Sequence, residues 1–405
     1  MSAGHPHAVE GYVHPAFEPV RAAFVQNFTR RRELGGACCA WVRGEKVVDL
    51  WGGVRNAATG EPWERDTMVI VYSATKGLAA MTLAVAHSRG WLDYDERVCT
   101  YWPEFAQQGK ERITVRQLLA HQAGLYVLDT ALDRNLVSDF DRLAIVLARQ
   151  KPAWEPGTRQ AYHGITLGFY QSELLRRMDP QHRSLGRFFQ DEIATPLGLD
   201  VYIRLPEDVP DARLARMSRP SFVEMLQGFP LRLTIDTLNR NSMIAKSLRG
   251  SELPHDERRV YARDLEIPSG GGVGTARAIA HAYSAFATGG LQLGLRPDTL
   301  AELAAPAIPP ARGSYDECLK GYGISFSLGF AKPSAALPFG SASAFGSPGA
   351  GGAFGFADPA AGIGYAYITD RMGTRLSGDP RDVALRNALY AAIPASPAAA
   401  RQHVA

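Results

Sequence analysis

The stretch that most constrains this chain is residues 71–77, because it places Ser73 and Lys76 three positions apart at a boundary between two kinds of structure. Residues 68–71 are apolar and prone to form a strand, whereas residues 77–85 are apolar enough to form a buried helix. If that helix begins near Ser73, positions i and i+3 share one of its faces. The spacing therefore predicts that the Lys76 amino group lies one turn above the Ser73 hydroxyl.

A serine and a lysine in this arrangement can form a covalent catalyst. The N-terminus of a helix favours the negative charge that develops during acyl transfer. Burial among alanine and leucine lowers the pKa of a lysine toward the range that suits a general base. The same residues also fit a helix that Ser73 merely caps, with Lys76 exposed one turn later. Residues 71–77 alone leave both interpretations open.

Size and charge set the class of protein. A chain of 405 residues exceeds a usual single core, so we expect two lobes. The hydrophobic content of 46% and charged content of 21% are typical of a soluble globular protein. The 44 basic and 41 acidic residues leave a net charge of +3 without a basic stripe. Neither nucleic acid nor a membrane is therefore an expected partner, and the oligomeric state stays open.

Nothing in the sequence predicts a metal or a cofactor. The four cysteines, Cys38, Cys39, Cys99 and Cys318, lack the spacing of a metal site, and the first two should point to opposite faces of a strand. Residues 1–14 contain no apolar core of signal-peptide length, and no run approaches a membrane span of about 18 apolar residues. We therefore expect a cytoplasmic protein.

Strand and helix patterns at both ends of the chain enclose a middle that is mostly helical. Residues 1–14 read as a flexible tail, and the Gly-rich run 269–274 reads as a tight turn rather than a phosphate loop. The other expected elements are a helix that begins near Phe17 and ends at 30–32, a hairpin of strands 37–42 and 46–51, helices at 165–178, 187–193, 275–288 and 381–393, and strands at 322–330, 353–356 and 362–368.

A sheet built from both ends makes the middle of the chain an insertion. We therefore divide the chain into an N-terminal α/β part (1–66), a mainly helical domain (67–265) and a C-terminal α/β part (266–405). Within the helical domain, the proline-rich segment 200–265 is irregular. A long irregular segment in a compact protein is often a lid or a binding loop, so a lid-like loop is predicted there.

A second signal lies at residues 154–164, where a Pro-Gly turn precedes Tyr162 and a buried helix. Tyrosine is a poor base at its free pKa of about 10. Beside the Lys76 ammonium its phenolate would be favoured, and it could then take a proton from a serine hydroxyl. Taken alone, the stretch fits a tyrosine of the core better than a catalytic one.

Taken together, these stretches resemble the serine β-lactamase-like hydrolases, and among them the family VIII carboxylesterases, which are relatives of class C β-lactamases and penicillin-binding proteins. The resemblance runs in family order from about residue 17 to 393. It rests on Ser73-x-x-Lys76, on residues 118–125 (LLAHQAGL), on Pro156-Gly157 with Tyr162, on residues 196–198 (PLG) and on residues 345–352 (FGSPGAGG). It implies an α+β fold in which helices flank an antiparallel sheet that carries an inserted, mainly helical domain.

The resemblance also implies roles for individual residues. Ser73 would be the nucleophile, Lys76 and Tyr162 would share the activating proton, and the backbone N–H groups of Ser73 and Ala350 would form the oxyanion hole. The third family motif falls at 347–349, so Ser347 and Gly349 are expected to contact substrate. His163, which follows Tyr162, could contact substrate or have a structural role.

The chain departs from the family at Ser347, where a cation or an imidazole usually stands. In lactamases that cation faces the substrate carboxylate. Its absence favours a serine esterase that hydrolyses small carboxylic esters through an acyl-enzyme. The alternatives with the same apparatus are a β-lactamase, a D-amino acid amidase or peptidase, and an acyltransferase. A non-catalytic binding or assembly protein on this fold is the alternative of another class.

Overall fold

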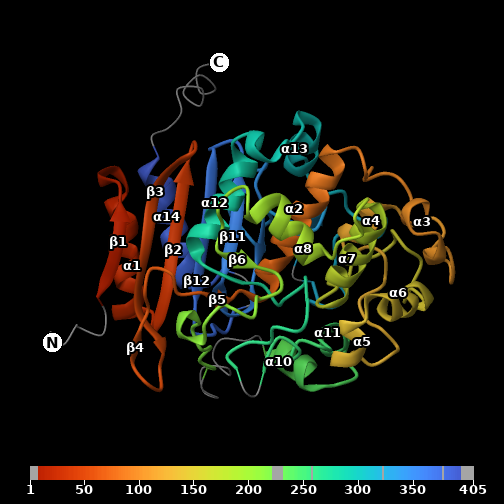
Figure 1. The fold of residues 1–405 in the computed structure, drawn as a ribbon, viewed down its shortest axis with the longest axis horizontal. Coiled ribbons are helices and arrows are strands. Elements are labelled where there is room, and N and C mark those ends of the chain that lie inside the picture. The colour runs from red at the N-terminus through yellow and green to blue at the C-terminus, as the bar shows by residue number, and fades with distance from the viewer. Residues whose placement is uncertain (1–7, 221–230, 257–258, 322, 376–377, 394–405) are drawn as a thin grey trace.

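The computed structural model describes residues 8–220, 231–256, 259–321, 323–375 and 378–393. A large sheet lies at one end of the molecule and most of the helices lie at the other, with helix α2 (Thr75–Ser88) between them (Figure 1). None of the helices in those ranges is long and apolar enough to cross a membrane.

The sheet joins the two ends of the chain, as the sequence predicts. Its strands follow the order β1-β3-β2-β12-β11-β10-β9-β8, with β4 beside β3, and every neighbouring pair is antiparallel. The central pairing of β2 with β12 matches Cys39 to Ala366 across the chain. The strands span Val9–Val13 (β1), Gly35–Val42 (β2), Glu45–Asn56 (β3), Glu61–Pro62 (β4), Ser325–Ser327 (β8), Phe330–Lys332 (β9), Phe345–Pro348 (β10), Phe354–Asp358 (β11) and Ile363–Thr369 (β12).

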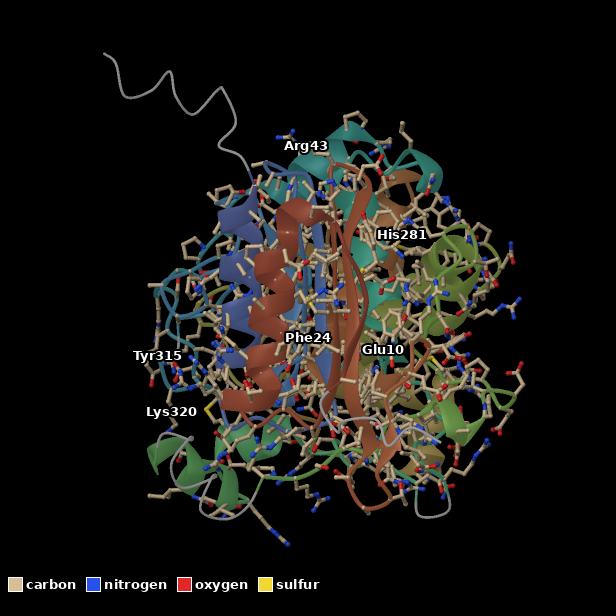
Figure 2. All side chains as sticks on the ribbon, turned by 90° about the vertical axis from the view of Figure 1, so that its left-hand side faces the viewer. Glu10, Phe24, Arg43, His281, Tyr315 and Lys320 are labelled. Carbon is tan, nitrogen blue, oxygen red and sulfur yellow. The ribbon has the colours of Figure 1, made fainter. Side chains whose placement is uncertain are left out.

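Helices cover both faces of this sheet. Helices α1 (Glu18–Arg30) and α14 (Pro380–Ala392) lie side by side on one face, and Phe24 of α1 points toward the strands (Figure 2). Helix α12 (Ala276–Ala287) packs on the other face. The neighbours Cys38 and Cys39 belong to the two different apolar clusters under these helices, which confirms that they point to opposite faces.

Tight turns fix the register of two hairpins. Arg43 and Gly44 have φ angles of 54° and 84° between β2 and β3, and this left-handed pair matches the twist of two antiparallel strands. Leu328 and Gly329, with φ of 51° and 88°, do the same between β8 and β9. The β pattern expected at 322–330 is therefore the start of a hairpin rather than one strand.

The N-terminal segment corrects one expectation. Residues 9–13 are not a flexible tail but the edge strand β1, which pairs with β3 from Val9–Gly52 to Val13–Val48. Only Val13 of this strand is buried, so its sequence carries little of the apolar alternation that would have predicted it. Backbone pairing with β3 holds this segment in an extended strand instead. The first part of the predicted tail, residues 1–7, lies outside the described residues.

The helical region surrounds α2. Its helices span Val98–Tyr101 (α3), Val115–Leu119 (α4), Arg134–Ser138 (α5), Phe140–Arg149 (α6), Thr166–Met178 (α7), Leu185–Phe189 (α8), Leu231–Leu238 (α10), Met243–Ser247 (α11) and Pro297–Ala304 (α13). One apolar cluster continues from the sheet through α2 to α7 and α8, so the two regions share a core. The segment 200–265 is not wholly irregular, because it contains α10 and α11.

Candidate active site

Ser73 stands at a sharp turn between a strand and a helix. Strand β5 (Val69–Ile70) belongs to a small sheet with β7 (Val273–Gly274) and β6 (Val201–Tyr202). A 3-10 turn, Tyr72–Ala74, then leads into α2. Tyr72 has a φ of 45°, a conformation that bulky residues rarely adopt and that surrounding structure must enforce. The nucleophile candidate therefore sits on a strained turn just before the helix rather than inside it.

Lys76 follows Ser73 by one turn, and its amino group lies next to the Ser73 hydroxyl, as the spacing predicts. Its Nζ is 3.3 Å from Ser73 Oγ and donates to two backbone carbonyls, Gly164 O at 2.7 Å and Ser269 O at 2.8 Å. The side chain is 2% exposed, and burial lowers the pKa of Lys76 to about 7. A neutral amine uses both of its N–H groups on these carbonyls, which leaves its lone pair for the serine proton.

Tyr162 approaches Ser73 from the other side. Its hydroxyl donates to Ser73 Oγ at 2.7 Å, and its ring stacks on Phe326 with centroids 5.7 Å apart. The expected stabilisation of a phenolate by the Lys76 ammonium is wrong, because burial raises the pKa of Tyr162 to about 12. Lys76 Nζ lies 5.0 Å from the ring centroid and directs its hydrogen bonds elsewhere. Tyr162 is thus a hydroxyl donor toward Ser73 in this state.

The third motif meets the serine turn at close range. A Cβ on Gly349 would come within 2.2 Å of Val71 O, so only glycine lets the end of β10 lie against the turn that carries Ser73. Ala350, next in the chain, lines the same cavity as Ser73. Ser347 lines it too, but its hydroxyl donates to Ser73 O at 2.7 Å. Ser347 therefore fixes the backbone of the serine turn.

The two histidines near Tyr162 differ in placement. His163 is fully buried and does not line the cavity; its Nε2 accepts from Leu125 N–H at 3.0 Å, and its Nδ1 lies 2.7 Å from Ala161 O. Burial lowers the pKa of His163 to about 4. The structure thus places His163 in a structural position. His121, which accepts from the His163 N–H at 3.0 Å, is the histidine that lines the cavity.

Two buried side chains that the sequence did not single out hold the Tyr162 segment. Asp316 accepts from Tyr162 N–H at 3.2 Å, and Ser247 donates to Tyr162 O at 2.6 Å and accepts from Gly164 N–H at 2.7 Å. Both come from segments far away in the chain, so no local pattern could have indicated them. Together they hold the phenol and the Gly164 carbonyl around Lys76.

These residues line a cavity of about 520 Å³, a volume within the usual range for small-molecule sites. Its far walls are apolar and include Phe326, Ile324 and Leu319, while α11 and its neighbourhood contribute Ile244 and Leu248. The segment 200–265 also supplies Arg219, Pro220 and Thr237, so the predicted lid-like loop does contact the cavity. Among the described residues, no three His, Cys, Asp or Glu side chains gather as metal ligands would.

The chain is similar to several known proteins over nearly its full length. A family model described as Beta-lactamase matches residues 20–389. The esterase/beta-lactamase LipL of Mycobacterium tuberculosis is 32% identical over 374 residues, which cover 90% of this chain and 83% of that protein. Among solved structures, a family VIII carboxylesterase is 34% identical with a TM-score of 0.83, covering 95% of this chain and 100% of the other. A penicillin-binding protein homolog from Caulobacter crescentus is 32% identical with a TM-score of 0.81 and the same coverage.

These likenesses define the class of protein as a serine hydrolase with the β-lactamase/transpeptidase-like fold. The chain belongs to the β-lactamase family, which confirms the resemblance inferred from its motifs. The fold of mixed helices and antiparallel sheet is confirmed as well. The catalytic and substrate-binding roles of individual residues stay predictions, which the geometry above makes specific. They concern Ser73, Lys76, Tyr162, Ser347, Gly349 and Ala350.

Proposed function

We propose that this protein is a serine esterase that hydrolyses carboxylic esters through an acyl-enzyme on Ser73. The observation that carries the proposal is the pair of contacts on Ser73 Oγ, with Lys76 Nζ at 3.3 Å and the Tyr162 hydroxyl at 2.7 Å. Neutral Lys76 has a lone pair that can accept the serine proton, and the Tyr162 hydroxyl can donate a proton. Both lie within the reach that general acid–base catalysis requires, given that such contacts tighten when substrate binds.

In acylation, neutral Lys76 takes the proton from Ser73 Oγ as the oxygen attacks the ester carbonyl. The carbonyl oxygen becomes an oxyanion, which the N–H groups of Ser73 and Ala350 stabilise. Collapse of this intermediate breaks the bond to the alcohol. The Tyr162 hydroxyl protonates the departing alkoxide, and the Lys76 ammonium returns a proton to the phenolate. Both groups therefore end the step as they began it.

In deacylation, the same two groups act on water. Lys76 accepts a proton from the water molecule as it attacks the acyl-enzyme, and the oxyanion forms in the same hole. When the second intermediate collapses, the bond to Ser73 Oγ breaks and the carboxylic acid leaves. Tyr162 protonates the released serine oxygen and recovers its proton from Lys76. The products are one alcohol and one carboxylic acid.

The surroundings of Ser73 support an ester over a lactam. A lactam is held by a carboxylate beside its reacting carbonyl, and a cation at the position of Ser347 would face it. Ser347 is neutral, is 4% exposed, and gives its hydroxyl hydrogen to Ser73 O. A simple ester lacks that carboxylate, so the absence of a cation at this position does not weaken its binding. The names of two relatives, an esterase/beta-lactamase and a carboxylesterase, are consistent with this reaction.

The test compares one ester and one lactam on a single preparation. We expect kcat/KM for a short-chain 4-nitrophenyl ester to exceed that for nitrocefin by on the order of 10²-fold or more, the discrimination that a missing charged partner can produce. Ser73→Ala should lose both activities while keeping the circular dichroism spectrum and melting temperature of the parent. Efficient turnover of nitrocefin by the parent protein would exclude the esterase assignment, and an active, folded Ser73→Ala would exclude the nucleophile.

A further inference from the structure

A second hollow of about 420 Å³ adjoins the catalytic cavity, with which it shares Leu248, Arg219, Ala350 and Met372. Tyr72, the residue before the nucleophile candidate, lines this hollow, so we call it the Tyr72 hollow. The left-handed φ of 45° at Tyr72 is a backbone strain of the kind that is common at ligand sites. The hollow thus lies next to the position where an ester would react.

The wall of the Tyr72 hollow is aromatic and rich in sulfur. Tyr72, Met217 and Val260 are half-buried and pack on the apolar cluster that includes Tyr261. Tyr261 also lines the hollow, and its hydroxyl is already bonded to a backbone carbonyl. The ring of His255 lies 6.3 Å from that of Tyr72 and is tilted by 53°. Aromatic rings and thioethers both pack favourably on another aromatic ring, so this wall suits an aromatic ligand.

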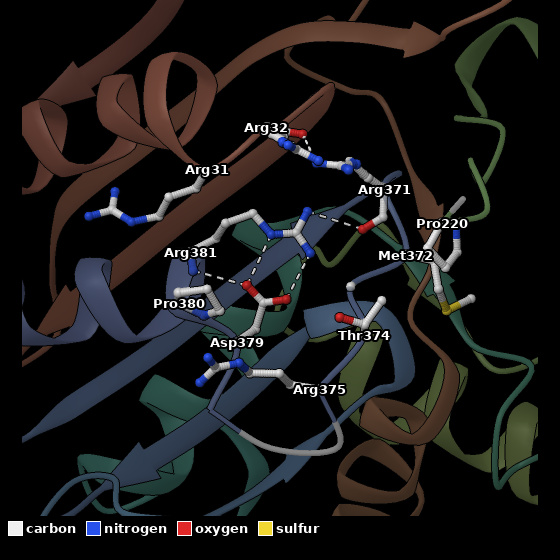
Figure 3. Close-up of a pocket in the computed structure, with 11 residues that line it drawn as sticks. Arg31, Arg32, Pro220, Arg371, Met372, Thr374, Arg375, Asp379, Pro380 and Arg381 are labelled. Atoms are coloured by element: carbon white, nitrogen blue, oxygen red, sulfur yellow. Dashed lines mark hydrogen bonds and ion pairs between the residues drawn. The ribbon is translucent and has the colours of Figure 1, made fainter. Parts of the chain in front are cut away.

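The segment that carries Met372 is anchored to the loop that follows β10. Gly373 N–H donates to Gly351 O at 2.9 Å, and Arg381 donates to the same carbonyl at 2.9 Å. Arg381 is 3% exposed and also donates to both oxygens of Asp379 (Figure 3). This anchoring fixes Met372 relative to the segment of the proposed oxyanion hole, so one wall of the hollow is formed before any ligand binds.

The proposed chemistry decides which part of an ester can reach this hollow. The alcohol oxygen has to lie at the Tyr162 hydroxyl, and Tyr162 lines the catalytic cavity but not the Tyr72 hollow. The oxyanion has to face the N–H groups of Ser73 and Ala350. Of the three groups on the reacting carbon, this leaves the acyl chain. Ala350 and Leu248 line both hollows, so a chain that starts beside Ala350 can pass from one into the other.

We propose that the Tyr72 hollow binds the acyl part of the ester and selects an aromatic acyl group, such as phenylacetyl or 3-phenylpropanoyl. This inference rests on the proposed function and names its substrate class. The alcohol part then lies in the catalytic cavity, near Tyr162 and Phe326. A phenyl ring packs on the rings of Tyr72 and His255 in a way that a saturated ring of similar size does not. An acetyl group is too short to reach them.

The test varies the acyl group and keeps 4-nitrophenol as the alcohol. One series carries a phenyl ring at the end of the acyl chain (phenylacetyl, 3-phenylpropanoyl, 4-phenylbutanoyl), and the matched series carries a cyclohexyl ring. Each rate is divided by that of hydroxide-catalysed hydrolysis, which removes differences in intrinsic reactivity. At the best chain length we expect kcat/KM for the aromatic ester to exceed that of its saturated partner by on the order of tenfold, the effect of one favourable ring contact. Equal values at every chain length would overturn the proposal.

His255→Leu removes one ring of the wall and keeps an apolar side chain there. We expect it to bring the ratio of the two series to within about twofold of one. His281→Leu is the matched control, because His281 also stacks on an aromatic ring, that of Trp41 with centroids 4.4 Å apart, and lines neither hollow. Both variants are checked by circular dichroism and melting temperature. An equal fall in the two variants would reject the hollow as the origin of the preference.

A reciprocal series decides which part of the ester the hollow holds. Benzyl acetate and cyclohexylmethyl acetate carry the matched rings on the alcohol instead of the acyl group. We expect His255→Leu to change the ratio within the acyl series and not within the alcohol series. The opposite pattern would place the alcohol in the Tyr72 hollow and overturn the assignment.

A binding measurement keeps this inference distinct from the esterase assignment. Binding of methyl 3-phenylpropanoate and of its cyclohexyl analogue to Ser73→Ala can be measured by calorimetry, whether or not any ester is cleaved. We expect the aromatic ester to bind more tightly by on the order of tenfold, and His255→Leu in the same background to remove most of the difference. Loss of turnover with this preference intact would reject the esterase and keep the hollow. Equal binding of the two esters would reject the hollow.

Discussion

Lowering the pH should switch off ester cleavage through one group, Lys76. Burial moves the pKa of Lys76 from 10.5 to about 7, and the neutral amine is the form that accepts the Ser73 proton. About a tenth of the molecules carry that form at pH 6, about half at pH 7 and about nine tenths at pH 8. We therefore expect kcat/KM for a neutral ester to rise about tenfold per pH unit below about pH 7 and to level off above about pH 8.

The lowered pKa of Lys76 determines how much of the neutral amine is present at pH 7. A lysine with the ordinary value would be neutral in only about one molecule in 3,000 at pH 7, so burial raises the amount of active base by on the order of 10³-fold. Two histidines near Tyr162 do not titrate in the pH range over which kcat/KM is expected to rise. Burial lowers the pKa of His163 to about 4, and it lowers the pKa of His121 well below its ordinary value.

The assay records nitrophenol release at its isosbestic wavelength in buffers of constant ionic strength. Two variants test the assignment of the profile to Lys76. Lys76→Arg keeps a positive charge that cannot be lost, and Lys76→Met removes the charge and the base. Both should be inactive, with their folds checked by circular dichroism. A flat profile between about pH 5.5 and 8.5, or appreciable cleavage by Lys76→Arg, would refute the role of Lys76 as base.

Three further outcomes are expected. Tyr162→Phe should lower kcat by at least about 10²-fold, the usual scale of a general acid or base, while its ring still stacks on Phe326 and the melting temperature stays near that of the parent. The unfolded chain keeps a proton on Lys76 up to about pH 10.5 and the folded chain releases it near pH 7, so the unfolding free energy should rise by up to about 1.4 kcal/mol per pH unit between these values. Urea titrations of Lys76→Met should show a smaller rise, because Lys110 and Lys332, whose pKa values burial lowers to about 8, still contribute above that pH. Arg381→Met should cost about 3–5 kcal/mol in the same titration, because it leaves the buried Glu33 and Asp379 without their shared partner; a loss below about 1 kcal/mol would contradict the anchoring role.

Local rules were enough for the parts of the site that lie within one turn of chain. The three-residue spacing placed Lys76 Nζ within reach of Ser73, and apolar neighbours predicted the lowered lysine pKa. The β2–β3 hairpin followed from Arg43 and Gly44, whose left-handed conformations such turns require. The pairing of the chain ends followed from the order of strand and helix patterns.

Contacts between distant segments could not be predicted in this way. The carbonyls that hold Lys76 belong to Gly164 and Ser269, which lie 88 and 193 positions further along the chain. The phenol of Tyr162 was expected to ionise because a cation was nearby, but the cost of burying a phenolate outweighs that attraction. Strand β1 was missed because its order comes from backbone pairing with β3 rather than from its own sequence.

In the proposed mechanism, Ser73 forms an ester with the acyl group of the substrate. The most direct measurement is intact-protein mass spectrometry after the enzyme is mixed with a 4-nitrophenyl ester and quenched in acid within the first turnovers. We expect a mass increase equal to the acyl group, located by peptide mapping on Ser73 and absent from Ser73→Ala. Turnover of the ester by a protein that never carries the acyl group, or that carries it on another residue, would contradict it.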